Sequence, residues 1–158
     1  MIRRESSVIA IYPRGAMQKL ALARFVNAHQ WAVEATVGED GSPQAAVIGV
    51  AATDDFELVF DTSTRSRKAE NLRRTKRIAI VVGWDEGETV QLEGTVDEPT
   101  GDERARLVAA YVAKFADGED RAKDDDITHF RIRPTWARHS DYRGAVVKIE
   151  ETRYDDPA

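Results

Sequence analysis

The chain has 158 residues, a formal net charge of -5, 42% hydrophobic and 32% charged residues, and no cysteine. This balance excludes an intrinsically disordered chain and predicts one soluble globular domain spanning residues 1–158, with its core at about residues 13–150. The lack of cysteine excludes disulfides, zinc sites built on thiolates and a cysteine nucleophile.

The N-terminus has an apolar patch of only four residues, at positions 8–11. Such a patch is too short for the core of a signal peptide or for a membrane span. We therefore expect a cytoplasmic protein with no membrane partner. The net negative charge argues against general DNA coating, which needs a broad basic surface.

The first half of the chain predicts one helix followed by three strands. Residues 13–29 predict the helix, because one face carries Met17, Leu22, Phe25, Val26 and His29. Residues 31–38 alternate and predict the first strand, which has Trp31, Val33, Ala35 and Val37 on one face and Glu34 and Thr36 on the other. An Asp-Gly turn at 39–43 leads to strands at 44–53 and 56–62, and this order favours an antiparallel meander.

The second half predicts two helices and four strands. A short helix is expected at about residues 66–74, with Ser66 as its N-cap, followed by strands at 77–84 and 89–96. The next helix, at 100–118, should start with a capping box between Thr100 and Glu103 and end at a left-handed Gly118. Its buried stripe should consist of Leu107, Val108, Tyr111, Val112 and Phe115. An acidic loop at 117–126 should precede strands at 127–136 and 144–150.

About seven strands and three helices result, without β-α-β alternation. This order disfavours a parallel doubly wound sheet. It predicts a mostly β domain, an antiparallel barrel with peripheral helices.

Positive charge is concentrated at one junction, where seven of the thirteen residues at 65–77 are basic. Arg67 and Lys68 fall in the first turn of the short helix, where the helix dipole favours acidic residues instead. A phosphate bound by these cations, the helix N-terminus and the hydroxyls of residues 62–64 would resolve the conflict. The alternative is a solvated basic face. The cations at 73–77 complement the C-terminal end of the helix dipole and need no ligand.

The stretch "LVFDTSTRSRKAENLRRTKRIAIVV" resembles the central signature of the pyridoxamine 5'-phosphate oxidase-like superfamily, the FMN-binding split barrels. The alternating "VQLEGTV", the long amphipathic helix after it and the strand "ITHFRIRPTWARHSDY" are similar to the family pattern in order and spacing. The resemblance extends over residues 25–142. It implies an antiparallel split β-barrel that forms a homodimer with a flavin at the interface.

The resemblance also implies roles for individual residues. The triplet Ser66-Arg67-Lys68 would form the phosphate site, with Arg67 and Lys68 holding the FMN phosphate. The flavin would be lined by Asp61 and Thr62 at a strand end, by Gln91, and by residues 46–49, which include Val47 and Ile48. A flavin-dependent oxidoreductase of unknown small-molecule substrate is therefore expected, and no catalytic residue is assigned.

Two departures from the family pattern argue against a vitamin B6 oxidase. Ala46, or Ala45 in a shifted register, stands where the oxidases have an arginine that clamps the phosphate. The segment with Arg138 and His139 lacks the Arg-x-His pattern that binds substrate. Alternatives on the same fold are a relative that binds the deazaflavin F420 or haem, and a non-catalytic flavin-binding sensor.

The other candidate sites are weaker. His29, His129 and His139 show no metal-ligand spacing, and we expect no metal site. Trp136, Arg138 and His139 either contact ligand in the partner's site or pack at an edge strand. Nucleic acid is not expected as a partner, because the only aromatic residues near the basic junction lie in strands.

Overall fold

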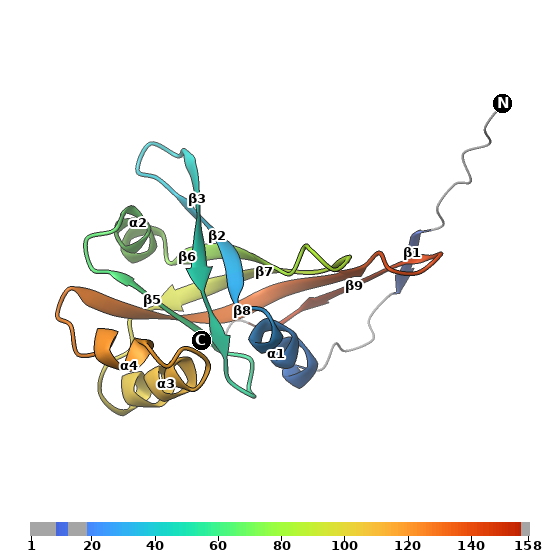
Figure 1. The fold of residues 1–158 in the computed structure, drawn as a ribbon. Helices are drawn as coiled ribbons and strands as arrows, with labels where there is room; N and C mark the ends of the chain where they lie inside the picture. Colours follow the sequence, from blue (N-terminus) through green and yellow to red (C-terminus); the bar gives the residue numbers. More distant parts are fainter. Residues whose placement is uncertain (1–8, 13–18, 156–158) are drawn as a thin grey trace.

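The computed structural model describes residues 9–12 and 19–155. The helices are α1 (Lys19–Ala28), α2 (Arg67–Thr75), α3 (Gly101–Lys114) and α4 (Gly118–Arg121). The strands are β1 (Ile9–Tyr12), β2 (Trp31–Val37), β3 (Pro43–Gly49), β4 (Ala51–Ala52), β5 (Leu58–Ser63), β6 (Arg77–Val82), β7 (Glu88–Asp97), β8 (Ile127–Asp141) and β9 (Val147–Arg153). Figure 1 shows α2 beside the β2–β3 hairpin and α3 with α4 at the opposite side of β5.

The strands form one bent sheet with the order β1-β9-β8-β7-β6-β2-β3, and β5 pairs with both β4 and β8. All pairs are antiparallel except β1 with β9. β5 and β9 share the edge of β8 that lies opposite β7, with β5 along its first half and β9 along its second half. The predicted class, mostly β with an antiparallel barrel and peripheral helices, is confirmed as a half-barrel.

The predicted strand at 44–53 is interrupted at Val50, and its two parts make the two pairings of the predicted antiparallel meander. β3 pairs with β2, and β4 pairs with β5. At this bend, side chains form hydrogen bonds with backbone groups. Lys114 Nζ donates to the Val50 carbonyl at 2.6 Å, and the Asn27 amide bonds both the carbonyl and the N–H of Ala52 at 2.8 Å.

Helices α1 and α2 agree with the prediction where they are described. Leu22 and Val26 are buried as expected, and α1 ends at Ala28, just before His29. The part of the predicted first helix at 13–18, with Met17, lies outside the described residues. In α2 the Ser66 side chain accepts a hydrogen bond from the Ala69 N–H, which confirms the N-cap.

The long helix begins where predicted, with Thr100 as its N-cap residue, but the predicted capping box and the predicted end at Gly118 are wrong. The Thr100 side chain makes no capping hydrogen bond, and the Glu103 carboxylate pairs with Arg106 and Arg131. Helix α3 ends at Lys114, and Gly118 begins α4 inside the predicted acidic loop. Gly118 is needed for close approach, since a Cβ there would lie 2.9 Å from ring carbons of Tyr111.

Of the last two strands, β8 is longer than predicted and β9 is shifted towards the C-terminus. β8 continues to Asp141 because β7 pairs with it on one side and β9 on the other, and β9 spans Val147–Arg153 instead of 144–150. The core lies inside the curve of the sheet, where the rings of Phe60 and Phe130 stack with centroids 5.6 Å apart. A smaller cluster joins Leu107 and Tyr111 of α3 to Ala51 and Val59.

Candidate functional site

The basic junction is a rigid turn between β5 and α2. Thr62 Oγ1 donates to Ser66 Oγ at 3.0 Å, and Ser66 Oγ accepts the Ala69 N–H at 3.2 Å. This chain of hydrogen bonds fixes the end of the strand to the start of the helix. Arg67 and Lys68 are consequently the first two residues of α2, as the sequence predicts.

One cavity, the α2 pocket, lies between the start of α2 and strands β2 and β3. Its volume is about 270 Å³, and it is lined by Glu34, Thr36, Gln44, Ala45, Ala46, Arg67 and Lys68. Arg67 Nε donates to Gln44 Oε1 at 3.0 Å, and Asn71 Nδ2 donates to the same oxygen at 3.0 Å. Among the described residues, the terminal nitrogens of Arg67 make no hydrogen bond with the protein. They remain available to an anion.

Lys68 faces a buried carboxylate that the sequence interpretation missed. Its Nζ lies 4.0 Å from Glu34 Oε1, and the two side chains are 18% and 2% exposed. Burial raises the pKa of Glu34, and the Lys68 ammonium opposes the rise. The alternation of β2 is confirmed, but the face with Glu34 and Thr36 is the buried one, because α2 packs on it. A glutamate in an alternating strand carries no signal in the sequence that it will be buried.

A second cavity, the α3 pocket, adjoins the first at Lys68. Its volume is about 340 Å³. Its lining brings together five of the predicted residues: Val47, Ile48, Asp61, Thr62 and Lys68. The remaining wall comes from Gln30, Trp31, Gly49, Tyr111, Phe115, Asp117 and Arg121. The residues from α3 and α4 were not predicted, because residues 117–126 appear in the sequence as a solvated acidic loop.

Asp61 is paired within this pocket. Arg121 NH2 lies 2.7 Å from Asp61 Oδ2, and the Tyr111 hydroxyl donates to Asp61 Oδ1 at 3.1 Å. Desolvation raises the pKa of Tyr111 above its ordinary value, and the Asp61 charge adds to the rise, so the phenol remains protonated. The Asp61 side chain is 9% exposed, whereas that of Arg121 is 42% exposed. Asp61 therefore positions Arg121 at the pocket wall.

His129 lies next to this group and is 2% exposed. Its ring centroid is 5.9 Å from that of Tyr111, and neither ring nitrogen has a hydrogen-bond partner in the described part of the chain. Desolvation lowers the pKa of His129, although the Asp61 carboxylate acts in the opposite direction. A neutral, packed imidazole follows. Within residues 9–12 and 19–155 no group of three or more histidine, aspartate or glutamate side chains is arranged to hold a metal ion.

The structure does not bring Ser66 or Gln91 into the lining of either pocket. Ser66 acts as the cap that positions Arg67 and Lys68. Gln91 lies on β7, which β6 and β2 separate from β3 in the sheet. It belongs to a cross-strand row with Val81 of β6, Val33 of β2 and Val47 of β3, so these side chains share the outer face of the sheet.

The C-terminal candidates Trp136, Arg138 and His139 also lie away from both pockets. Arg138 NH2 pairs with Glu151 at 2.6 Å, and His139 Nε2 lies 2.6 Å from Glu88 Oε1. These partners come from β9 and β7, the strands that flank the second half of β8. Within one chain, the contacts are those of strand packing.

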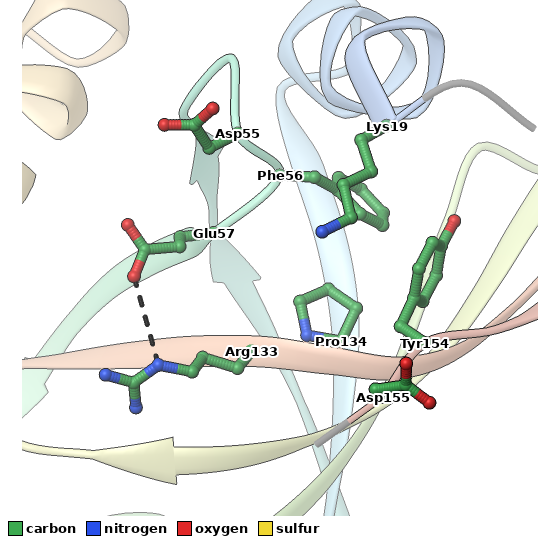
Figure 2. A pocket seen from close by; sticks show the side chains of 8 residues that line it. All are labelled: Lys19, Asp55, Phe56, Glu57, Arg133, Pro134, Tyr154 and Asp155. Carbon is green, nitrogen blue, oxygen red and sulfur yellow. Dashed lines mark ion pairs between the residues drawn. The ribbon is translucent and has the colours of Figure 1, made fainter. Parts of the chain in front are cut away.

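A third cavity, of about 240 Å³, lies near the C-terminal end of β9. Figure 2 shows its lining: Lys19, Asp55, Phe56, Glu57, Arg133, Pro134, Tyr154 and Asp155. Phe56 has a left-handed backbone with φ of 65°, which is unusual for an aromatic residue. Its side chain is buried, at 2% exposed. None of the predicted site residues lines this cavity.

Comparisons with known proteins identify the family and the fold of this chain. A sequence model described as pyridoxamine 5'-phosphate oxidase matches residues 19–141. A pyridoxine/pyridoxamine 5'-phosphate oxidase of Burkholderia vietnamiensis is 36% identical over 77 residues, which are 48% of this chain and 36% of that protein. The protein of the same name from Thermosynechococcus vestitus is 42% identical over 65 residues, 40% of this chain and 31% of that one. The matches cover about a third of the length of these relatives.

Solved structures with low sequence identity share the fold. A heme-binding protein from Mycobacterium smegmatis aligns with a TM-score of 0.74 and 22% identity, over 90% of this chain and 59% of that chain. A pyridoxamine 5'-phosphate oxidase-related, FMN-binding protein from Nostoc punctiforme aligns with a TM-score of 0.64 and 16% identity, over 91% and 93%. The half-barrel is therefore the antiparallel split barrel of these proteins.

Proposed function

This chain belongs to the pyridoxamine 5'-phosphate oxidase family, and we propose that it binds FMN and acts as a flavin-dependent oxidoreductase on a small molecule. The observation that carries the proposal is the position of Lys68, which lines both the α2 pocket and the α3 pocket. One elongated ligand could therefore place an anionic end in the first cavity and a ring in the second.

The residues of the α2 pocket fit a phosphate. The N-terminus of α2 has N–H groups without acceptors in the helix, and its dipole favours an anion. Arg67 would take two phosphate oxygens through its terminal nitrogens, and Lys68 would act as a point charge. Thr62 and Ser66 fix the turn that aims these groups. The neutral side chain at Ala46 leaves this site with less positive charge than an additional arginine would give.

The α3 pocket would hold the flavin ring along β3. Val47 and Ile48 offer an apolar strand, and Asp61 and Thr62 offer polar groups at the end of β5. The bound flavin would supply the redox chemistry. The protein would orient the ring and limit access of water from the side of Tyr111 and Arg121. We assign no general acid or base.

A homodimer is part of the proposal, supported by the outer face of β3, β2 and β6. Trp31 is 51% exposed, Val37 47% and Val47 63%, and apolar residues of this extent on one face are typical of an interface. Trp31 and Val47 also line the α3 pocket, so a second copy on this face would close the cavity. Gln91 lies on the same face, and we retain it as a flavin contact contributed by the second copy.

The test is the absorbance spectrum of the purified protein before and after titration with FMN. The wild type should be yellow or become so, and the double variant R67A/K68A should lose FMN. R65A is the matched control, because the Arg65 side chain is 79% exposed and pairs with Asp126 outside both pockets. A wild-type protein that takes up no FMN would sink the proposal.

The second candidate is the deazaflavin F420, favoured by the low positive charge of the α2 pocket. Parallel titrations with FMN and F420 separate the two cofactors. We do not propose haem as the cofactor, because within the described residues no histidine lines the α2 or α3 pocket. A Soret band on addition of haem would contradict this choice. Retained flavin without turnover of pyridine nucleotides or quinones would favour a flavin-binding sensor over an enzyme.

The packing of Arg138 and His139 gives no support for extending the oxidase reaction of the named relatives to this chain.

The described residues include no helix that is both long and apolar enough to cross a membrane.

A further inference from the structure

Glu34 is a buried carboxylate in the α2 pocket, whose lining also contains the two cations Arg67 and Lys68. It is 2% exposed and lines the α2 pocket. Its Oε1 lies 4.0 Å from Lys68 Nζ, beyond hydrogen-bond distance, and its Oε2 has no hydrogen-bond partner in the described part of the chain. A buried oxygen without a partner is costly, and it indicates a group that a ligand would complete.

The charges around Glu34 all come from one side. Its cross-strand neighbours are Ala46 on β3 and Ile80 on β6, both uncharged. The helix α2 supplies Lys68 and, on the wall of the same pocket, Arg67. The pocket therefore has two positive groups and one negative group. Its net charge is one positive unit while Glu34 is ionised.

This charge does not match a phosphate monoester at neutral pH. A monoester has a second pKa of about 6 and carries between one and a half and two negative charges at pH 7. Beside an ionised Glu34, such a group would meet a carboxylate that is shielded from water, where repulsion is strong. The same carboxyl in its protonated form would instead donate a hydrogen bond to a phosphate oxygen.

We propose that a phosphate group enters the α2 pocket together with one proton from solvent, which the Glu34 carboxylate accepts. The neutral carboxyl then donates to the phosphate, and Lys68 exchanges its distant pairing with Glu34 for a pairing with the ligand. Glu34 thus sets which phosphates bind: a dianionic monoester needs the proton, whereas a singly charged diester does not. The inference rests on the proposed function, because it concerns the same pocket.

The expected signature is proton uptake that depends on both Glu34 and the phosphate. Because the pKa of Glu34 is then higher in the complex than in the free protein, the Kd for FMN rises with pH, up to about tenfold per pH unit between the two values. Calorimetry from pH 6 to 9, in buffers of different ionisation enthalpy, counts the protons. Wild type should take up close to one proton more than E34Q, and E34Q should bind FMN more tightly at pH 8.

The matched ligand is riboflavin, which lacks the phosphate and should bind without this proton in wild type. This comparison needs no variant, so it decides the question even if E34Q does not fold. The same proton count for FMN in wild type and E34Q, or for FMN and riboflavin in wild type, would overturn the inference.

Inorganic phosphate separates this inference from the flavin assignment. If wild type ignores FMN but phosphate raises its Tm with a pH dependence that E34Q lacks, the flavin assignment fails and the role of Glu34 stands. If neither FMN nor phosphate binds, both fail.

Discussion

Lys114 holds the bend next to the α3 pocket, and its replacement by methionine tests how that bend is stabilised. The Nζ of Lys114 donates to the carbonyls of Val26 at 2.9 Å, His29 at 2.6 Å and Val50 at 2.6 Å. These contacts join the end of α1 and the break between β3 and β4 to α3. Methionine preserves the length of the side chain but leaves the three carbonyls without this donor.

The expected loss of unfolding free energy in K114M follows from two opposing contributions. Hydrogen bonds from a charged donor contribute about 1.5–3 kcal/mol each, so three contribute about 5–9 kcal/mol. Burial lowers the pKa of Lys114 from 10.5 to about 8. At about 1.4 kcal/mol per pKa unit, this desolvation costs about 3 kcal/mol. We expect K114M to lose about 3 kcal/mol of unfolding free energy, a fall in Tm of about 6–12 °C.

The pH dependence of this loss has a definite sign. Between pH 8 and 10.5 the folded protein has released the Lys114 proton, whereas the unfolded chain still holds it. The unfolded state therefore binds more protons, and the contribution of Lys114 to the unfolding free energy rises with pH across this window. The difference between wild type and K114M should widen from pH 8 towards pH 10.

Urea unfolding at pH 7.5, 8.5 and 9.5 measures both effects. K123M is the matched control, because Lys123 is a lysine with a 67% exposed side chain in surface ion pairs, and it should change stability by less than about 0.5 kcal/mol. Equal stability of K114M and wild type at pH 7.5 would refute the assigned hydrogen bonds. A difference that stays flat with pH would refute the lowered pKa.

Three further predictions address the interface, the packing of α4 and acid stability. V47R should convert a dimer to a monomer by light scattering without lowering the Tm of the monomer, since Val47 is 63% exposed; an unchanged mass would place the interface elsewhere. G118A should lose about 1–3 kcal/mol by urea unfolding, because the added methyl would lie 2.9 Å from the Tyr111 ring. G144A is its control, because a methyl there would lie 3.5 Å from the Val146 carbonyl oxygen. The hydrogen bonds from Arg73 lower the pKa of Glu98, so this pair stabilises the fold above pH 4.5 and the stability is lost as the pH falls. E98Q should reduce this loss of unfolding free energy at acid pH. An unchanged dependence of stability on acid pH would contradict the pairing.

Features that depend on neighbouring residues were predicted well. The Ser66 cap, the start of α2 at Arg67 and the alternation of β2 arise from groups a few residues apart, and all three are confirmed. The same local logic failed at Thr100. There the capping partner Glu103 pairs with Arg131, a residue of β8 that no local pattern could connect to it.

The candidate site was predicted in part. Strand ends and a helix start identified Thr62, Arg67 and Lys68, and the structure places these residues at adjoining pockets. Arg121 was missed, because its role depends on α4 packing against Asp61. Gln91 remains a prediction, since sheet order separates β7 from β3 within one chain.

The sequence by itself determined most of the elements, the mostly β class and the cationic helix start, because these follow from periodicity, turn residues and capping over short distances. Only the tertiary structure decided which face of β2 is buried and where the charges meet. α2 covers the face with Glu34, so this carboxylate lies 4.0 Å from Lys68 rather than in water. The apolar face with Trp31 remains outside. Burial depends on which element packs on a strand, and alternation alone cannot specify that.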